Sequence, residues 1–136
     1  MSAQQISVFL ENKPGQLAEV TSLLAENGIN LKALNIAETS SYGVLRLITD
    51  NTARTEKILS EHGWVSSLTP VVPVLVPDTP GGLSAVLRIL AEHNIDIEYM
   101  YSVLGGHSKK ACMIFRVGNP ENTYAVLKKN GIETLD

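Results

Sequence analysis

Short apolar runs alternate with amphipathic segments along the chain. In the first half, the apolar run at residues 6–10 predicts a strand. The segment after it is amphipathic, and its apolar face carries residues at helical spacing, namely Leu17, Val20, Thr21 and Leu24. Residues 29–49 predict a hairpin, a second helix follows through Glu61, and a fourth strand begins at Trp64.

Proline and glycine mark the ends of the first helix. We predict that it runs from Pro14 or Gly15 to Asn27, with Pro14 at the first helical position, where a missing N–H costs nothing. Gly28 can adopt the left-handed conformation that ends a helix. A Pro-Gly turn therefore connects the first strand to the first helix.

The second half of the chain repeats the first. A shift of 66 positions superposes the strand, turn and first helix of the two halves, and a shift of 68 superposes their second helices. The matched pairs include Pro14 with Pro80, Gly15 with Gly81, and Leu17 with Leu83. A fixed repeat of this kind indicates a duplicated structural unit.

The repeated order of strand, helix, strand, strand, helix, strand is that of the split βαβ unit. We predict an α+β protein of two ferredoxin-like βαββαβ units, each with an antiparallel sheet and its helices on one face. The predicted units are residues 1–70 and 71–136. Pro70 and Pro73 lie at the boundary, and they are expected to interrupt the strand pairing because proline has no N–H to donate.

Composition narrows the possible partners. The chain has 136 residues, 44% of them hydrophobic and 18% charged, which is typical of a globular protein. Its formal net charge of −3 and its scattered lysines exclude a basic stripe for nucleic acid. No segment approaches the roughly 18 apolar residues of a membrane span, so we expect a cytoplasmic protein that contacts no membrane. The single cysteine, Cys112, is predicted to be a buried structural thiol.

The candidate binding residues lie in the two strand-to-helix turns. In the first copy they are Asn12, Lys13, Pro14, Gly15, Gln16 and Leu17, and in the second Asp78, Thr79, Pro80, Gly81, Gly82 and Leu83. The first N–H groups of a helix have no intrahelical partner, and the helix dipole favours an anion there. Asn30 and Asp96 begin the second strand of each unit, and we expect them to face the same site as the turn.

A free amino acid suits these groups, because its carboxylate needs N–H donors and its ammonium needs oxygen acceptors. The first copy is neutral, with Asn12 and Asn30, whereas the second is acidic, with Asp78 and Asp96. An acidic copy favours a donor-rich or cationic ligand, and we expect the Asp78 copy to be the more selective. The alternative is that each turn has only local turn and capping roles.

Both halves resemble the ACT domain, an amino-acid-sensing module of biosynthetic enzymes. The resemblance rests on residues 12–17 with 27–31, and on residues 78–83 with 93–97. It implies that ligand binds at the seam between modules, and that residues at the positions of Asn12 and Asn30 contact it. Leu10 and Val76 stand where serine-sensing members of the family have a histidine, which argues against serine as the ligand.

No catalytic or metal site is predicted. His62 and His93 lie near helix ends, and His107 lies in a glycine-rich loop that lacks the helix of a phosphate-binding loop. No Cys-x-x-Cys pair is present for a metal. RNA-recognition domains share the βαββαβ order, but the strand at residues 44–48 lacks their stacking aromatics.

We therefore predict a regulatory protein that binds a free amino acid, without catalysis or a cofactor. A homodimer is expected because sheet edges tend to be covered, and a partner enzyme of amino-acid metabolism is a further expected partner. One alternative is a subunit whose repeat serves assembly only. Another is a small enzyme that uses Asp78 or Asp96.

Overall fold

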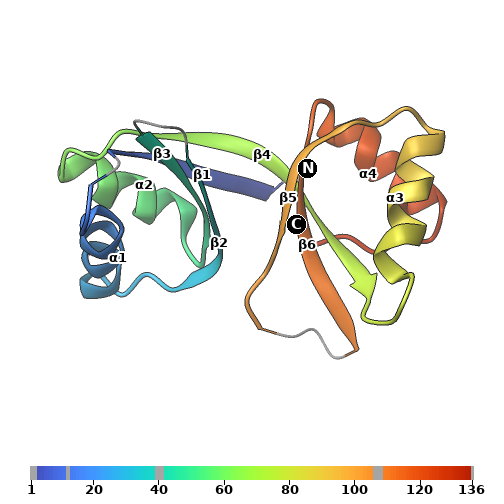
Figure 1. Ribbon diagram of the computed structural model, residues 1–136, viewed down its shortest axis with the longest axis horizontal. Coiled ribbons are helices and arrows are strands. Elements are labelled where there is room, and N and C mark those ends of the chain that lie inside the picture. The colour runs from blue at the N-terminus through green and yellow to red at the C-terminus, as the bar shows by residue number, and fades with distance from the viewer. Residues whose placement is uncertain (1–2, 12, 39–41, 106–108, 136) are drawn as a thin grey trace. The chain divides into compact units, whose positions relative to one another are not determined.

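The computed structural model describes residues 3–11, 13–38, 42–105 and 109–135. These residues form two compact units, of which one spans Gln4–Thr69 and the other consists mainly of the chain from Pro70 onward. We refer to them as the N-terminal and C-terminal units. Figure 1 shows that each has a sheet with two helices on one face.

The N-terminal unit contains six elements in the predicted order. They are β1 (Ala3–Glu11), α1 (Gln16–Glu26), β2 (Leu31–Glu38), β3 (Tyr42–Thr49), α2 (Thr52–Glu61) and the start of β4 (Ser66–Pro77). The strands lie in the order β2-β3-β1-β4, and β3 pairs antiparallel with both β1 and β2.

The C-terminal unit repeats this arrangement. It contains the rest of β4, then α3 (Gly82–Glu92), β5 (Ile97–Ser102), β6 (Lys110–Val117) and α4 (Pro120–Lys129). The strand β6 pairs antiparallel with both β4 and β5. A short final segment bridges Val74 to Thr134, where the Leu75 N–H donates to the Glu133 carbonyl at 2.9 Å. The two units confirm the predicted α+β class and the duplicated βαββαβ order.

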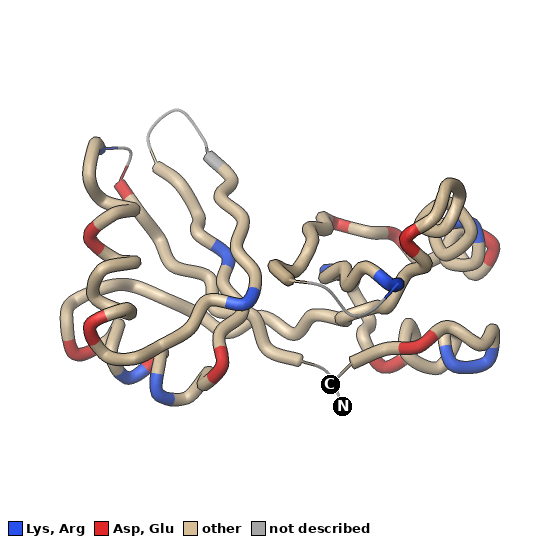
Figure 2. The backbone as a smooth tube through the Cα atoms, turned by 90° about the horizontal axis from the view of Figure 1, so that it is seen from below, with Lys and Arg blue, Asp and Glu red and all other residues tan. Residues whose placement is uncertain are grey.

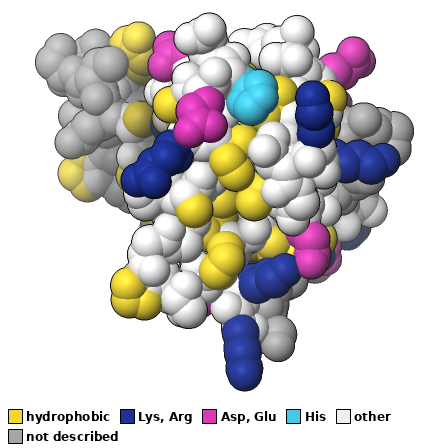
Figure 3. Space-filling view, turned by 90° about the vertical axis from the view of Figure 1, so that its right-hand side faces the viewer, with side chains coloured by type: hydrophobic (Ala, Val, Ile, Leu, Met, Phe, Trp, Pro, Cys, Tyr) yellow, Lys and Arg dark blue, Asp and Glu magenta, His cyan; other side chains and the backbone are white. Residues whose placement is uncertain are grey.

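Each unit has its own core between sheet and helices. In the N-terminal unit, alternate residues of β1 (Ile6, Val8 and Leu10) pack with Val20 and Leu24, which the helical spacing had indicated. The largest fully buried side chain of the C-terminal core is Phe115. Figure 3 shows a band of hydrophobic side chains on the face of this unit that carries α3 and α4, with charged side chains around it.

The expectation that prolines interrupt the strand at the unit boundary was wrong, because β4 continues from Ser66 to Pro77. Pro70 lies before Val72, the first residue that pairs with β6, so its missing N–H removes no ladder bond to that strand. Pro73 directs its carbonyl toward the final segment, where it accepts from the Leu135 N–H at 3.0 Å. This segment is short, so little pairing is lost there.

The second helix of each unit begins at an asparagine cap. The Asn51 side chain accepts from the Arg54 N–H, and the Asn119 side chain accepts from the Asn122 N–H, both at 3.1 Å. A cap of this kind contributes about 1 kcal/mol. None of the helices in the described ranges is long and apolar enough to cross a membrane.

Candidate functional site

The Pro-Gly segments form type II turns. The Gln16 N–H donates to the Lys13 carbonyl at 3.4 Å, and Gly15 has φ 88° and ψ −12°, as the third residue of this turn requires. Pro14 therefore lies in the turn, and its predicted place at the first helical position was wrong. The positive φ of Gly15 is incompatible with a helix, so the helix begins only at Gln16.

The second turn has the same backbone conformation. The Gly82 N–H donates to the Thr79 carbonyl at 3.0 Å, and Gly81 has φ 82° and ψ −4°. Pro80 takes the second position of the turn, as Pro14 does in the first. The residues Asp78 to Gly81 are exposed, Leu83 is half-buried and Gly82 is buried.

The helices that follow the turns begin without a capping side chain. The caps are glycines, and the first intrahelical bonds run from the Glu19 N–H to Gly15 and from the Ala85 N–H to Gly81. The N–H groups of Leu17 and Ala18 thus have no acceptor within α1. Asp78 does not cap α3, which removes the capping role considered for it.

The two turns differ where the strand end meets the helix. In the first copy, the Gln16 side chain accepts from the Glu11 N–H at 3.1 Å. The residues at these positions in the second copy are Gly82 and Pro77. A Cβ on Gly82 would lie 2.1 Å from the Pro77 carbonyl oxygen, so helix and strand backbones are in direct contact there.

A charged pair stands beside the first turn. The Lys13 Nζ lies 2.6 Å from a Glu11 carboxylate oxygen, and both side chains are about two-thirds exposed (67% and 66%). The hydrogen bond to Glu11, reinforced by its charge, raises the pKa of the Lys13 ammonium. Figure 2 shows that basic and acidic positions are scattered along the backbone of both units.

A small recess of about 80 Å³ opens next to this pair. Its lining comes from β1, the turn, α1, β2 and β3, and consists of Leu10, Glu11, Lys13, Gln16, Leu17, Ile36 and Gly43. Gly43 pairs with Leu10 across the β1–β3 ladder, which brings its backbone to the recess. Four residues that the sequence analysis had named, Leu10, Lys13, Gln16 and Leu17, therefore meet three that it had not. These three are Glu11, Ile36 and Gly43.

The turn and the start of β2 do not meet within one unit. The 11 residues of α1 separate the turn from Asn30, which corresponds to about 16 Å of helix. Asn30 instead bonds to Asp50 through two backbone contacts, since its N–H donates to the Asp50 carboxylate and its carbonyl accepts from the Asp50 N–H, both at 3.1 Å. The same helix length separates Asp96 from the second turn. Within one unit, the turn and the start of the second strand therefore lie at opposite ends of a helix, and a site that they share between two modules stays a prediction.

A family match covers the whole sequence. The profile of the ACT domain pair matches residues 1–136. The chain belongs to this family. No curated protein sequence matches this ACT pair.

Solved structures similar to the ACT pair include protein BT0572 from Bacteroides thetaiotaomicron. It is 39% identical, with a TM-score of 0.93, over 99% of this chain and 92% of that chain. The ligand-free regulatory subunit of aspartate kinase from Thermus thermophilus is 18% identical, with a TM-score of 0.63, over 95% and 93%. The corresponding subunit from Thermus flavus is 18% identical, with a TM-score of 0.58, over 95% and 92%. The likeness to the two Thermus subunits concerns the fold.

His62 and His93 have partners within their own helices. His62 and His93 each place Nδ1 near a carbonyl of the preceding helical turn, at 2.9 Å from Ile58 and 2.8 Å from Ile89. Cys112 is buried as predicted, and burial raises the pKa of its thiol. The described residues contain no group of three metal-ligating side chains.

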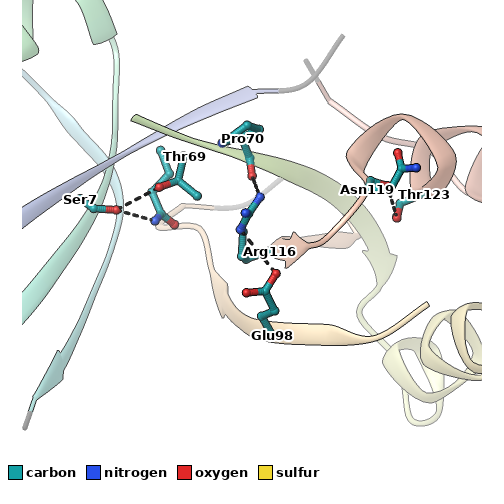
Figure 4. Close-up of polar contacts among 8 residues, drawn as sticks. Ser7, Thr69, Pro70, Glu98, Arg116, Asn119 and Thr123 are labelled. Carbon is teal, nitrogen blue, oxygen red and sulfur yellow. Dashed lines mark hydrogen bonds and ion pairs between the residues drawn. The ribbon is translucent and has the colours of Figure 1, made fainter. Parts of the chain in front are cut away.

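Figure 4 shows polar contacts of Arg116, which is half-buried, and of Ser7, which is buried. The Arg116 guanidinium donates to the Pro70 carbonyl at 3.0 Å and lies 3.7 Å from the Glu98 carboxylate. In the N-terminal unit, the Ser7 hydroxyl lies 3.4 Å from the Thr69 hydroxyl. These contacts hold strands together, and neither belongs to a turn. Asn12 and His107 lie outside the described residues.

The sequence contained a signal for the difference between the turns that motif reading missed. Under the shift of 66, Glu11 and Gln16 correspond to Pro77 and Gly82. In the first copy, Glu11 has a backbone N–H and Gln16 has the side chain that accepts from it. In the second copy, Pro77 has no N–H and Gly82 has no side chain. The two changes occur together, which indicates that a single contact between the strand end and the helix start differs between the copies.

Proposed function

We propose that this ACT pair is a regulatory protein that binds a free amino acid at its Pro-Gly turns and has no catalytic activity. The observation that carries the proposal is the exposed turn that leads into an uncapped helix start. The Leu17 and Ala18 N–H groups there have no intrahelical acceptor, and partial positive charge at a helix start favours a carboxylate. The Glu11–Lys13 pair beside the turn offers a partner of each sign to a zwitterion.

We further propose that ligand binding is passed on through an oligomer or a partner enzyme of amino-acid metabolism. The fold likeness to regulatory subunits of aspartate kinase supports this role. The strands β2 and β5 lie at ends of their strand orders and are candidates for pairing in a homodimer. In a dimer, the turn of one module faces the start of a second strand in another, and Asn30 and Asp96 then contribute from a neighbouring module.

A thermal-shift panel of the proteinogenic amino acids tests binding. A ligand at 100 times its dissociation constant stabilises the folded chain by about 2.7 kcal/mol. For a chain of this size, we expect the midpoint to rise by about 5–10 °C. The D-enantiomer of the responding amino acid is the control, since it has the same charges in another arrangement.

Two lysine variants test whether a ligand that raises the thermal midpoint binds at the first turn. Lys13→Ala is expected to weaken this response slightly, because an exposed charge contributes little. Lys57→Ala is the matched control, since Lys57 is also exposed and also pairs with a glutamate in the N-terminal unit. The absence of a response to every amino acid would favour the assembly alternative.

A further inference from the structure

The recess beside the first turn has the size of a small aliphatic side chain. Its volume is about 80 Å³, and its apolar walls are the side chains of Leu10, Leu17 and Ile36. A dry apolar cavity of about 150 Å³ holds benzene, so this recess suits about three carbon atoms. That is the size of the valine side chain.

Gly43 leaves the recess open. It is buried in β3 and has no side chain, and a Cβ added there would make ordinary contacts, at 3.6 Å from the Ala37 carbonyl oxygen and 3.8 Å from Ile36. The fold therefore tolerates alanine at this position. A glycine inside a strand often marks a place where a ligand approaches closely.

The C-terminal unit keeps one of the apolar walls, Leu83 in place of Leu17, and differs at the other corresponding positions. In its ladder, Val76 pairs with Ala111, so a methyl group stands where Gly43 pairs with Leu10. Ser102 occupies the position of Ile36. The charged pair is also missing, since Pro77 and Thr79 replace Glu11 and Lys13.

The backbone also closes the space beside the second turn. Gly82 approaches the Pro77 carbonyl so closely that no side chain fits between them. At the same point of the first turn, the Gln16 side chain spans the distance to the Glu11 N–H. Helix and strand are thus separated by a side chain in the first copy and touch in the second.

From these differences we infer that the first turn, and not the second, is the ligand site, and that it selects an amino acid with a valine-sized aliphatic side chain. The ligand side chain enters the recess, and its charged groups remain at the mouth beside Glu11 and Lys13. The second turn stabilises the C-terminal unit. This inference rests on the proposed amino-acid binding and adds the choice of turn and ligand.

Valine, threonine and leucine test the recess in the unmodified chain. Threonine has the shape of valine, but the polar side chains of the recess already have partners, since Lys13 pairs with Glu11 and Gln16 accepts from the Glu11 N–H. We therefore expect threonine to bind at least 10-fold more weakly. Leucine exceeds the volume and is expected to bind more weakly as well. Dissociation constants from calorimetry give the comparison directly.

Gly43→Ala tests the position of the side chain. The added methyl group fills part of the recess, so valine affinity should fall at least 10-fold while alanine affinity falls less. Gly118→Ala is the matched control, because Gly118 also has a negative φ and a Cβ there meets nothing within 4 Å. The thermal midpoints of both variants without ligand show whether each remains folded.

The outcomes separate the two proposals. If no amino acid binds the unmodified chain, the proposed function fails, and this inference fails with it. If an amino acid binds and Gly43→Ala binds it equally well, this inference alone is overturned. Preference for a charged or aromatic amino acid overturns it too, without any variant.

Discussion

Gly82→Ala is expected to destabilise the C-terminal unit by about 3 kcal/mol or more. The added Cβ would lie 2.1 Å from the Pro77 carbonyl oxygen and 3.0 Å from its carbon. Both atoms belong to the backbone, so neither a rotamer change nor a flexible side chain can relieve the overlap, and α3 must move away from β4. Forced displacement of well-packed elements typically costs 1–3 kcal/mol and sometimes more. Urea denaturation of the variant and the parent chain measures the loss.

The neighbouring glycine separates this steric effect from backbone strain. Gly81 has φ 82°, but a Cβ there meets nothing within 4 Å. Gly81→Ala should therefore cost about 1–2 kcal/mol, the usual penalty of the left-handed conformation. Gly15→Ala is the equivalent change in the first turn and should cost the same. Equal losses for Gly82→Ala and Gly81→Ala would contradict direct contact between helix and strand.

Phe115→Ala is expected to cost about 3–5 kcal/mol. Phe115 is fully buried in the C-terminal core, and its strand neighbours Val72 and Met100 cannot fill the space that a removed ring leaves. The loss combines the transfer of the ring from water with the energy of the cavity. Chemical denaturation monitored by circular dichroism checks it.

Phe9→Ala is the control for this prediction. Phe9 also lies on a strand but is 46% exposed, so its removal should cost about 1 kcal/mol or less. A loss at Phe115 as small as that at Phe9 would mean that the C-terminal core is not packed around this ring.

The repeated pattern of the sequence was sufficient to predict the order of elements. The helical face with Val20 and Leu24 packs on the core as its spacing indicates, and Gly28 ends the first helix with φ 72°. Local rules succeed at these positions because the apolar spacing of the helix and the glycine that ends it both lie within one short stretch of chain.

The predictions were wrong where two local rules compete, and incomplete where the outcome depends on how far apart two residues lie in space. Pro14 suits both a first helical position and the second position of a type II turn, and the positive φ of Gly15 decides for the turn. Proline generally interrupts strand pairing, but Pro73 lies beside the final segment of the chain, which is short. The separation of Asn30 from the turn depends on the direction of α1, which motif matching does not consider.

The recess could not be predicted from the turn motif. Ile36 and Gly43 are 20 or more positions away from Gln16 in the sequence, and they reach the turn only through the strand pairing of the N-terminal unit. The register places Gly43 opposite Leu10, and one residue of slip would direct it to the other face. The turn motif is therefore repeated in the sequence, whereas the space beside it is particular to the first copy.

The number of ligands bound per chain tests the inequality of the two turns most directly. Isothermal titration calorimetry of the full chain with valine gives this number without any variant. We expect one valine per chain, because the first turn has the recess, the Glu11–Lys13 pair and a helix and strand that are separated by the Gln16 side chain. Two equivalent valines per chain would contradict the account, since the closed contact between Gly82 and Pro77 would then not prevent binding.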